Sequence, residues 1–189
     1  MRAAAALVLA LLLAGCERYT LVAPGTVEVG SDLVVASPIQ WNRERDGSTE
    51  MWTVNGPALE ELRFVKGLED GDRLFSGTDA KKLPAFSPKM TPVEVQEFFE
   101  QSFQRAGVPT LSVTGLRPAK FGDGDGFRFE FTYALEDGLE REGFAVGAVR
   151  AEKLYLIVYS GTKLYFYGKH KADAEAIVAS ARLRTERSP

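Results

Sequence analysis

The sequence contains one cysteine, Cys16, and one histidine, His170, among 189 residues. A single thiol cannot form a disulfide within the chain, and it cannot build a cysteine-rich metal site. No serine lies in a Gly-x-Ser-x-Gly elbow, no Gly-x-x-x-x-Gly-Lys phosphate loop occurs, and a catalytic triad could draw on only one histidine. The chain is therefore predicted not to be an enzyme, and no cofactor or metal is expected.

The sequence also lacks an excess of basic residues and a long hydrophobic run. Its 23 basic and 26 acidic residues are interspersed and give a net charge of −3, so no basic surface is predicted to hold nucleic acid. The apolar run at residues 3–14 is shorter than the roughly 20 residues that a membrane-spanning helix needs. A hydrophobic content of 45% suits one packed domain, expected at residues 31–184 and followed by a loose tail at residues 185–189.

The N-terminus has the layout of a secretory signal. Arg2 supplies a positive charge, residues 3–14 are apolar, and small residues lead into Cys16. The last four residues of this segment, Leu-Ala-Gly-Cys, resemble the lipobox of bacterial lipoproteins, whose cysteine is acylated and becomes the new N-terminus after cleavage. An ordinary signal peptide with an incidental cysteine, or a buried free thiol, is the alternative.

The lipobox resemblance implies where the protein is held. It places a signal peptide at residues 1–15 and an acylated N-terminus with a tether at residues 16–30, so that membrane lipid is bound through Cys16. In proteobacterial lipoproteins, an aspartate directly after the cysteine favours retention at the inner membrane. Because Glu17 stands at this position, the resemblance implies the outer membrane, with the domain in the periplasm.

The clearest helix is expected at residues 91–106. Thr91 can cap the first amides while Glu94 reaches back, Pro92 suits the first helical position, and Gly107 ends the element. A helix lying on a membrane would need basic residues on its polar face, where three glutamates stand, so its apolar stripe is predicted to pack against a sheet. The stripe consists of Val95, Phe98, Phe99, Ser102, Phe103 and Ala106.

Alternating patterns predict this sheet. Phe127, Phe129, Phe131 and Tyr133 alternate with polar residues, which indicates a strand with an aromatic inner face. Residues 154–159 are apolar on both faces, which predicts a central strand with a layer on each side. Further strands are expected at residues 33–36, 39–41, 49–54, 62–66, 74–75, 111–116 and 139–150, and a second helix at residues 169–181.

The order of these elements resembles the α/β/α sandwich of the PsbP-like superfamily, which includes DcrB-like envelope lipoproteins, over about residues 30–184. Uncharacterised proteobacterial lipoproteins contain similar pieces of sequence: Trp41-Asn42-Arg43, Trp52-Thr53, Phe64 and Gly71. The resemblance implies an α+β fold with a mainly antiparallel central sheet and a docking or accessory role. It supplies no catalytic residues.

Three candidate sites follow from the residues alone. Trp41, Arg43 and Trp52 are candidate binding anchors, because tryptophan and arginine dominate interface energetics; core packing of both tryptophans is the alternative. The segment at residues 122–126 lacks the later ligands of a calcium loop, so a hairpin turn is predicted there. His170 has no carboxylate at a strong metal-ligand spacing and is expected to be a solvated residue of the last helix.

These features predict a membrane-anchored envelope lipoprotein whose domain is non-catalytic and binds a protein partner in the cell envelope. An alternative is a small-ligand-binding module with its cleft between the sheet and the loop at residues 67–90, where aromatic side chains could line an apolar pocket. A hydrolase that uses a pair of carboxylates is the third alternative.

Overall fold

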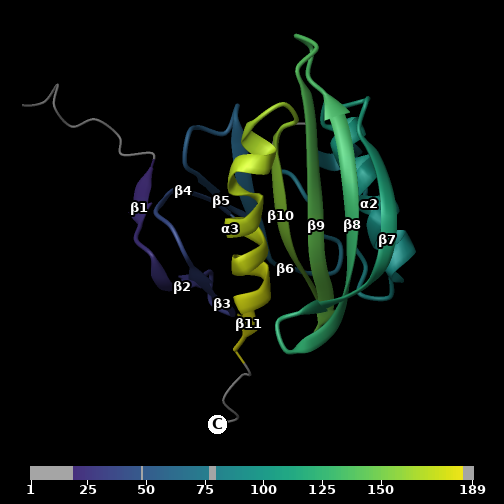
Figure 1. Cartoon of the computed structure of the whole chain (residues 1–189). Helices are drawn as coiled ribbons and strands as arrows, with labels where there is room; N and C mark the ends of the chain where they lie inside the picture. The colour runs from purple at the N-terminus through teal and green to yellow at the C-terminus, as the bar shows by residue number, and fades with distance from the viewer. Residues whose placement is uncertain (1–18, 48, 77–79, 185–189) are drawn as a thin grey trace, which may run out of the picture.

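The computed structural model describes residues 19–47, 49–76 and 80–184 (Figure 1). The expected signal peptide, the lipidation site Cys16 and the C-terminal tail lie outside the described residues. Within the described ranges, no helix has the length and hydrophobicity needed to cross a lipid bilayer.

A sheet of eight strands forms the centre of the molecule. Its strands are β1 (Thr20–Val22), β4 (Trp41–Asp46), β5 (Thr49–Thr53), β6 (Glu60–Leu68), β7 (Ser112–Phe121), β8 (Gly124–Ala134), β9 (Glu140–Arg150) and β10 (Lys153–Thr162). They follow the order β1-β4-β5-β6-β10-β9-β8-β7, and every pairing is antiparallel. The predicted antiparallel central sheet is therefore confirmed.

Helices cover both faces of this sheet. The helix α2 (Pro92–Arg105), preceded by a single 3-10 turn η1 (Ala80–Lys82), packs on one face, and α3 (Phe166–Ser180) packs on the other (Figure 1). A small sheet in the order β11-β3-β2 lies beside α3 and consists of β2 (Gly25–Val29), β3 (Leu33–Ser37) and β11 (Arg182–Leu183). One apolar core lies on each side of the large sheet, which makes the fold the expected α+β sandwich.

The predicted N-terminal cap of α2 is present. The Thr91 hydroxyl accepts a hydrogen bond from the Glu94 amide, and the Glu94 carboxylate accepts one from the Thr91 amide at 2.7 Å. The bond from the Thr91 amide, and after it a bond that the Thr91 hydroxyl donates to the same carboxylate at 2.9 Å, lower the pKa of the Glu94 carboxyl. The predicted stripe faces the sheet with four buried side chains: Val95, Phe98, Phe99 and Ser102.

The aromatic face of β8 meets this helix. The ring centroid of Phe99 lies 5.1 Å from that of Phe129 and 5.2 Å from that of Phe131. Strand β10 lies between β6 and β9 and is buried from Leu154 to Thr162, as the apolar pattern on both of its faces predicts. Aromatic alternation and a strand with two apolar faces were therefore reliable signals.

Two expected segments are wrong. Residues 16–30 are expected to form a tether, but β1 and β2 lie within this range. These strands belong to the folded domain, since Val22 and Val29 are buried in the core beside α3. Such edge strands bury only one or two side chains, so their periodicity is weak. The expected strand at residues 74–75 is a loop, because its backbone pairs with no described strand. Leu74 is nevertheless buried under α2.

Replacing Gly143 with alanine is expected to lower the free energy of unfolding by about 1–3 kcal/mol, the range for an overfilled core. A Cβ at this position of β9 would lie 2.5 Å from the backbone oxygen of Tyr159 and closer still to the Phe131 ring. Gly168→Ala in α3 is the matched control, because a Cβ there meets nothing within 4 Å; it should stabilise the fold by about 0.5–1 kcal/mol. Urea unfolding measures both, and equal effects would contradict the packing described.

Candidate functional site

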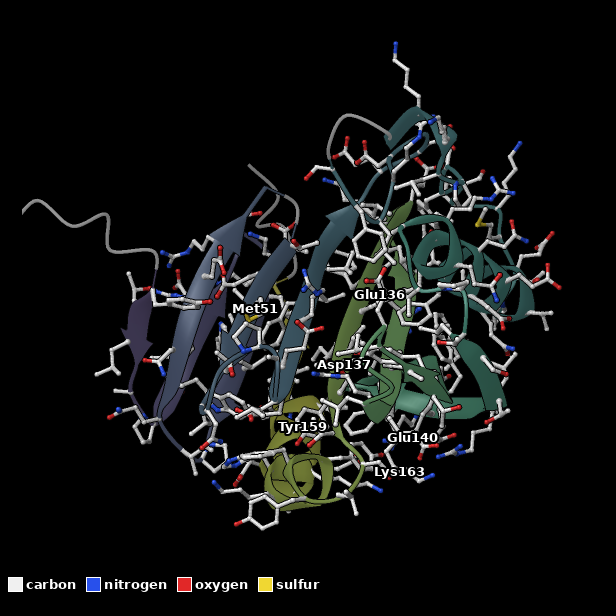
Figure 2. All side chains as sticks on the ribbon, turned by 90° about the horizontal axis from the view of Figure 1, so that it is seen from above. Met51, Glu136, Asp137, Glu140, Tyr159 and Lys163 are labelled. Atoms are coloured by element: carbon white, nitrogen blue, oxygen red, sulfur yellow. The ribbon has the colours of Figure 1, made fainter. Side chains whose placement is uncertain are left out.

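Three connections meet at one end of the sandwich, which we call the apical end: residues 54–59, 135–139 and 162–165. The amide of Thr162 donates to Leu59 O at 2.9 Å, and that of Lys163 donates to Glu140 O at 3.0 Å. Figure 1 shows the β8–β9 hairpin projecting beyond the other strands at this end, and Figure 2 looks down onto it. Backbone hydrogen bonds thus hold together segments that lie far apart in the sequence.

Local sequence signals shape each connection. Gly138, at φ +80°, allows the tight turn of the β8–β9 hairpin, and the Asp137 carboxylate accepts a bond from the Leu139 amide at 3.0 Å. The buried Glu60 carboxylate accepts hydrogen bonds from the amides of Val54 and Asn55, at 2.8 and 2.6 Å. The apical connections therefore form a fixed surface.

An apolar hollow lies at the apical end. It has a volume of about 760 Å³ and is lined by Leu59, Gly138, Leu139, Glu140, Thr162, Lys163, Leu164, Tyr165 and Phe166. Leu164 is 97% exposed and Tyr165 61% exposed, although both belong to a connection that is fixed by hydrogen bonds. Exposed apolar residues around a hollow are typical of a binding surface.

A second, more polar hollow of about 250 Å³ adjoins the first. Its lining consists of Thr110, Thr132, Tyr133, Ala134, Glu140, Arg141 and Lys163. The two hollows share Glu140 and Lys163, which form an ion pair at 2.9 Å and are labelled side by side in Figure 2. The hydrogen bond to Glu140 raises the pKa of the Lys163 ammonium, so Lys163 is charged at neutral pH.

Arg141 forms part of the wall of the polar hollow and is only 3% exposed. Its guanidinium donates to Ala58 O at 2.5 Å, Pro57 O at 3.2 Å and Ser160 Oγ at 3.3 Å, and it lies over the Tyr133 ring. No described carboxylate forms an ion pair with it, and its Nε has no hydrogen-bond partner. A buried cation whose partners are all neutral is unusual.

The sequence contains one Ser-x-x-Lys spacing, Ser160 to Lys163, which in some hydrolases joins a nucleophile to its base. Here it lies at the end of β10 rather than on a helix. The structure separates its members: the buried Ser160 hydroxyl contacts Arg141 and Tyr133, whereas Lys163 binds Glu140. The spacing therefore does not form a nucleophile–base pair.

His170 lies near the start of α3 and is buried, which corrects its expected solvated position. Its Nδ1 lies 3.2 Å from the Asp173 carboxylate and its Nε2 lies 3.2 Å from the Asn55 amide nitrogen. Because Lys169 donates to the amide oxygen of Asn55, the amide nitrogen donates to Nε2, and Nδ1 carries the proton. The Trp41 ring, 6.0 Å away, covers the imidazole, and the periodicity of α3 alone could not show this contact.

Tyr159 attaches the start of α3 to the sheet. Its buried hydroxyl lies 2.9 Å from Phe166 O and 3.0 Å from Tyr167 O. Burial raises the pKa of the Tyr159 hydroxyl far above its usual value, so it remains a hydrogen-bond donor. Tyr159 thus fixes the start of α3, directly after the connection that carries Leu164.

The structure corrects the expected surface anchors. Trp41 and Trp52 are fully buried, with ring centroids 6.5 Å apart, so both belong to the core beside α3. Arg43 lies beside the buried Glu50 carboxylate at 3.7 Å. The tryptophans face inward because β4 and β5 direct them toward α3. Core packing of both tryptophans, the alternative reading of the sequence, is therefore the correct one.

The other expected sites are also placed. The predicted hairpin turn is present: residues 122–123 form the tight β7–β8 turn, with Gly122 at φ +64°, and residues 124–126 begin β8. The described residues contain no group of three or more histidine, cysteine or acidic side chains that could hold a metal ion. In the described part of loop 67–90, Leu74 and Phe86 are buried against the sheet, and a hollow of about 270 Å³ is lined by Met90 of this loop together with Pro92 and residues of β8 and β9.

No sequence motif marks the apical hollows. Their sequence signal is a run of four large apolar residues at 164–167. The run follows the buried strand β10 and Lys163, and it is followed by Gly168 and Lys169. Such a run at the start of a helix cannot all face a core on one side. Leu164 and Tyr165 are the residues left outside.

The fold defines the class of protein. No protein-family model matches the sequence, and a search of curated proteins finds no relative. Solved structures are nevertheless similar, and they show that the chain has a PsbP-like fold.

The cyanobacterial PsbP protein CyanoP from Synechocystis is 12% identical, with a TM-score of 0.53 over 91% of this chain and 96% of that chain. A Bacteroides thetaiotaomicron protein is 13% identical, with a TM-score of 0.54 over 87% of this chain; the match spans 50% of the Bacteroides chain. LpqN, involved in cell envelope biogenesis of Mycobacterium tuberculosis, is 11% identical, with a TM-score of 0.39 over 92% of this chain and 88% of that chain.

Proposed function

We propose that this chain is a lipid-anchored accessory protein of the bacterial cell envelope. Acyl chains on Cys16 hold it at the outer membrane with its PsbP-like domain in the periplasm. The domain binds a protein partner through the apical end and catalyses no reaction. The carrying observation is the pair of exposed apolar residues, Leu164 and Tyr165, at the mouth of the apolar hollow.

The shape of the apical end supports protein binding. Interface hot spots combine large apolar or aromatic side chains with pockets that exclude water. Leu164 and Tyr165 are adjacent, are held by the turn bond from Tyr165 N to Thr162 O, and line one hollow. A partner surface that packed over the mouth of the hollow would bury both residues without a change in the fold.

The anchor rests on the sequence. A positive residue, a dozen apolar residues and the Leu-Ala-Gly-Cys quartet precede the folded domain. Two or more acyl chains retain a protein stably, since each buried methylene contributes about 0.8 kcal/mol. The accessory role is supported by analogy with PsbP, an analogy at the level of the fold.

Leu164→Asp is expected to abolish partner binding while leaving the fold intact. The test places a photoreactive amino acid at position 165 of the full chain and follows its cross-linked product in intact cells. Because loss of a hot-spot side chain costs 2 kcal/mol or more, the yield of this product should fall by about tenfold or more. Circular dichroism should be unchanged, since Leu164 is 97% exposed.

The matched control is Val93→Asp on α2, which introduces the same charge at another exposed apolar residue, 54% exposed. It should leave the cross-linked product unchanged. Equal losses for both variants, or no specific product for the unmodified sequence, would count against apical docking. Turnover of an envelope substrate by the purified chain would count against the non-catalytic role.

A further inference from the structure

The lining of the polar hollow contains more basic than acidic side chains, and Glu142, outside the lining, also acts on Lys163. The lining contains two basic side chains, Arg141 and Lys163, against one acidic side chain, Glu140. Glu140 pairs with Lys163, which leaves Arg141 with backbone and hydroxyl acceptors only. The carboxylate that acts on neighbouring Tyr133, Glu61, is paired with Arg63 at 3.0 Å.

Arg141 is the buried basic residue of this lining. Its side chain is 3% exposed, forms part of the hollow's wall and retains an unpartnered Nε. A buried polar atom without a partner is costly, and the charge of a carboxylate bound beside the guanidinium would offset part of this cost. Lys163 stands at the mouth and can exchange Glu140 for the same anion.

An apolar compartment begins on the other side of the Glu140–Lys163 pair. Its volume of about 760 Å³ falls in the range of roughly 300–1,000 Å³ that is typical of small-ligand pockets. Leu59, Leu139 and Leu164 supply aliphatic walls there. The site thus combines an anion position and an apolar chamber that share one ion pair.

We propose that the apical end binds an anionic amphiphile, with its carboxylate head at Arg141 and Lys163 and its aliphatic chain in the apolar hollow. The occupant is a single free molecule rather than a bilayer. The β8–β9 hairpin projects beyond the other strands at this end (Figure 1), which keeps a flat bilayer away from the hollows. This inference goes beyond the proposed function and does not depend on Cys16.

Photolabelling of the full chain in intact cells tests the proposal. The probe is dodecanoate with a diazirine on its chain, and its counterpart has the same chain with a trimethylammonium head. The carboxylate probe should label residues 138–141 or 162–166, and excess dodecanoate should prevent the labelling. The cationic probe should label these residues about tenfold less, since it cannot accept the charge-assisted hydrogen bonds.

Lys163→Gln should lower labelling by the carboxylate probe about tenfold, because one charge-assisted contact is lost. Lys169→Gln is the matched control; this exposed lysine donates to Asn55 and lines neither hollow. Arg141→Met, checked for folding by circular dichroism, should also lose head-group selectivity. Equal labelling by both probes, labelling confined to other residues, or equal losses in the two lysine variants would overturn the proposal.

The outcome is separable from that of the protein-docking test. Loss of amphiphile labelling with an intact cross-link at position 165 would overturn this inference alone. Loss of the cross-link with labelling intact would overturn partner docking alone.

Discussion

Cys16→Ala is expected to abolish fatty-acid labelling of the chain completely, and the protein should accumulate as an unprocessed precursor. Cys16 is the only thiol in the sequence, so no second residue can take the acyl group on sulfur. The physical effect is large, since each methylene of a lost chain removes about 0.8 kcal/mol of membrane affinity. Metabolic labelling with radioactive palmitate, followed by gel electrophoresis, measures both results.

Gly15→Ala is the matched control for this variant, because it keeps a small residue before Cys16. It should retain labelling and processing. Palmitate label that persists in Cys16→Ala would contradict acylation at Cys16. An unlabelled protein with the native sequence would contradict the lipid anchor and would favour an ordinary signal peptide.

Trp52→Ala is expected to destabilise the domain by about 3–5 kcal/mol, the usual range for removal of a large buried aromatic side chain. The Trp52 ring is fully buried and lies 4.7 Å from the Phe64 ring. Its Nε1 also donates to the buried Glu50 carboxylate at 2.8 Å, so the variant leaves a cavity and a weakened carboxylate site together. Such a loss is a large share of the about 5–15 kcal/mol that stabilises a typical domain.

Trp52→Phe separates these two contributions. It keeps most of the ring but removes the donor to Glu50, so we expect a loss of about 1–3 kcal/mol, the range for a buried acceptor that loses its partner. Adding Glu50→Gln should recover part of this loss, because a neutral amide is less costly to bury. Urea unfolding measures all three variants. A negligible loss for Trp52→Ala would contradict the core position of this residue.

The elements predicted correctly are those whose signals are local. The capping box at Thr91 and Glu94, the aromatic alternation of β8 and the two apolar faces of β10 each involve residues close in sequence. Hydrophobic periodicity determines which faces must be buried, so these elements and their layers follow from it.

The wrong predictions depend on contacts between distant residues. His170 is buried because Trp41 and Asn55, more than 100 positions earlier, close over it. Val22 is buried because β1 pairs with β4 at the sheet edge. A sequence pattern within one element cannot show which distant residues will cover it.

The apical site illustrates the same limit. Its apolar hollow joins Leu59, Leu139 and Leu164, one from each of three connections. Arg141 occupies a strand position where an outward, solvated arginine would be the ordinary expectation, yet it is buried beneath these connections. Only the register of β9 with β10, which pairs Arg141 with Thr162, brings it there.

Carbene footprinting of the full chain, in intact cells and after purification, tests most directly whether the apical end is occupied in the envelope. The account predicts that Leu164 and Tyr165 are strongly labelled in the purified protein and protected in cells, whereas Val93 is labelled equally in both. Equal labelling of Leu164 in cells and in the purified protein would contradict it.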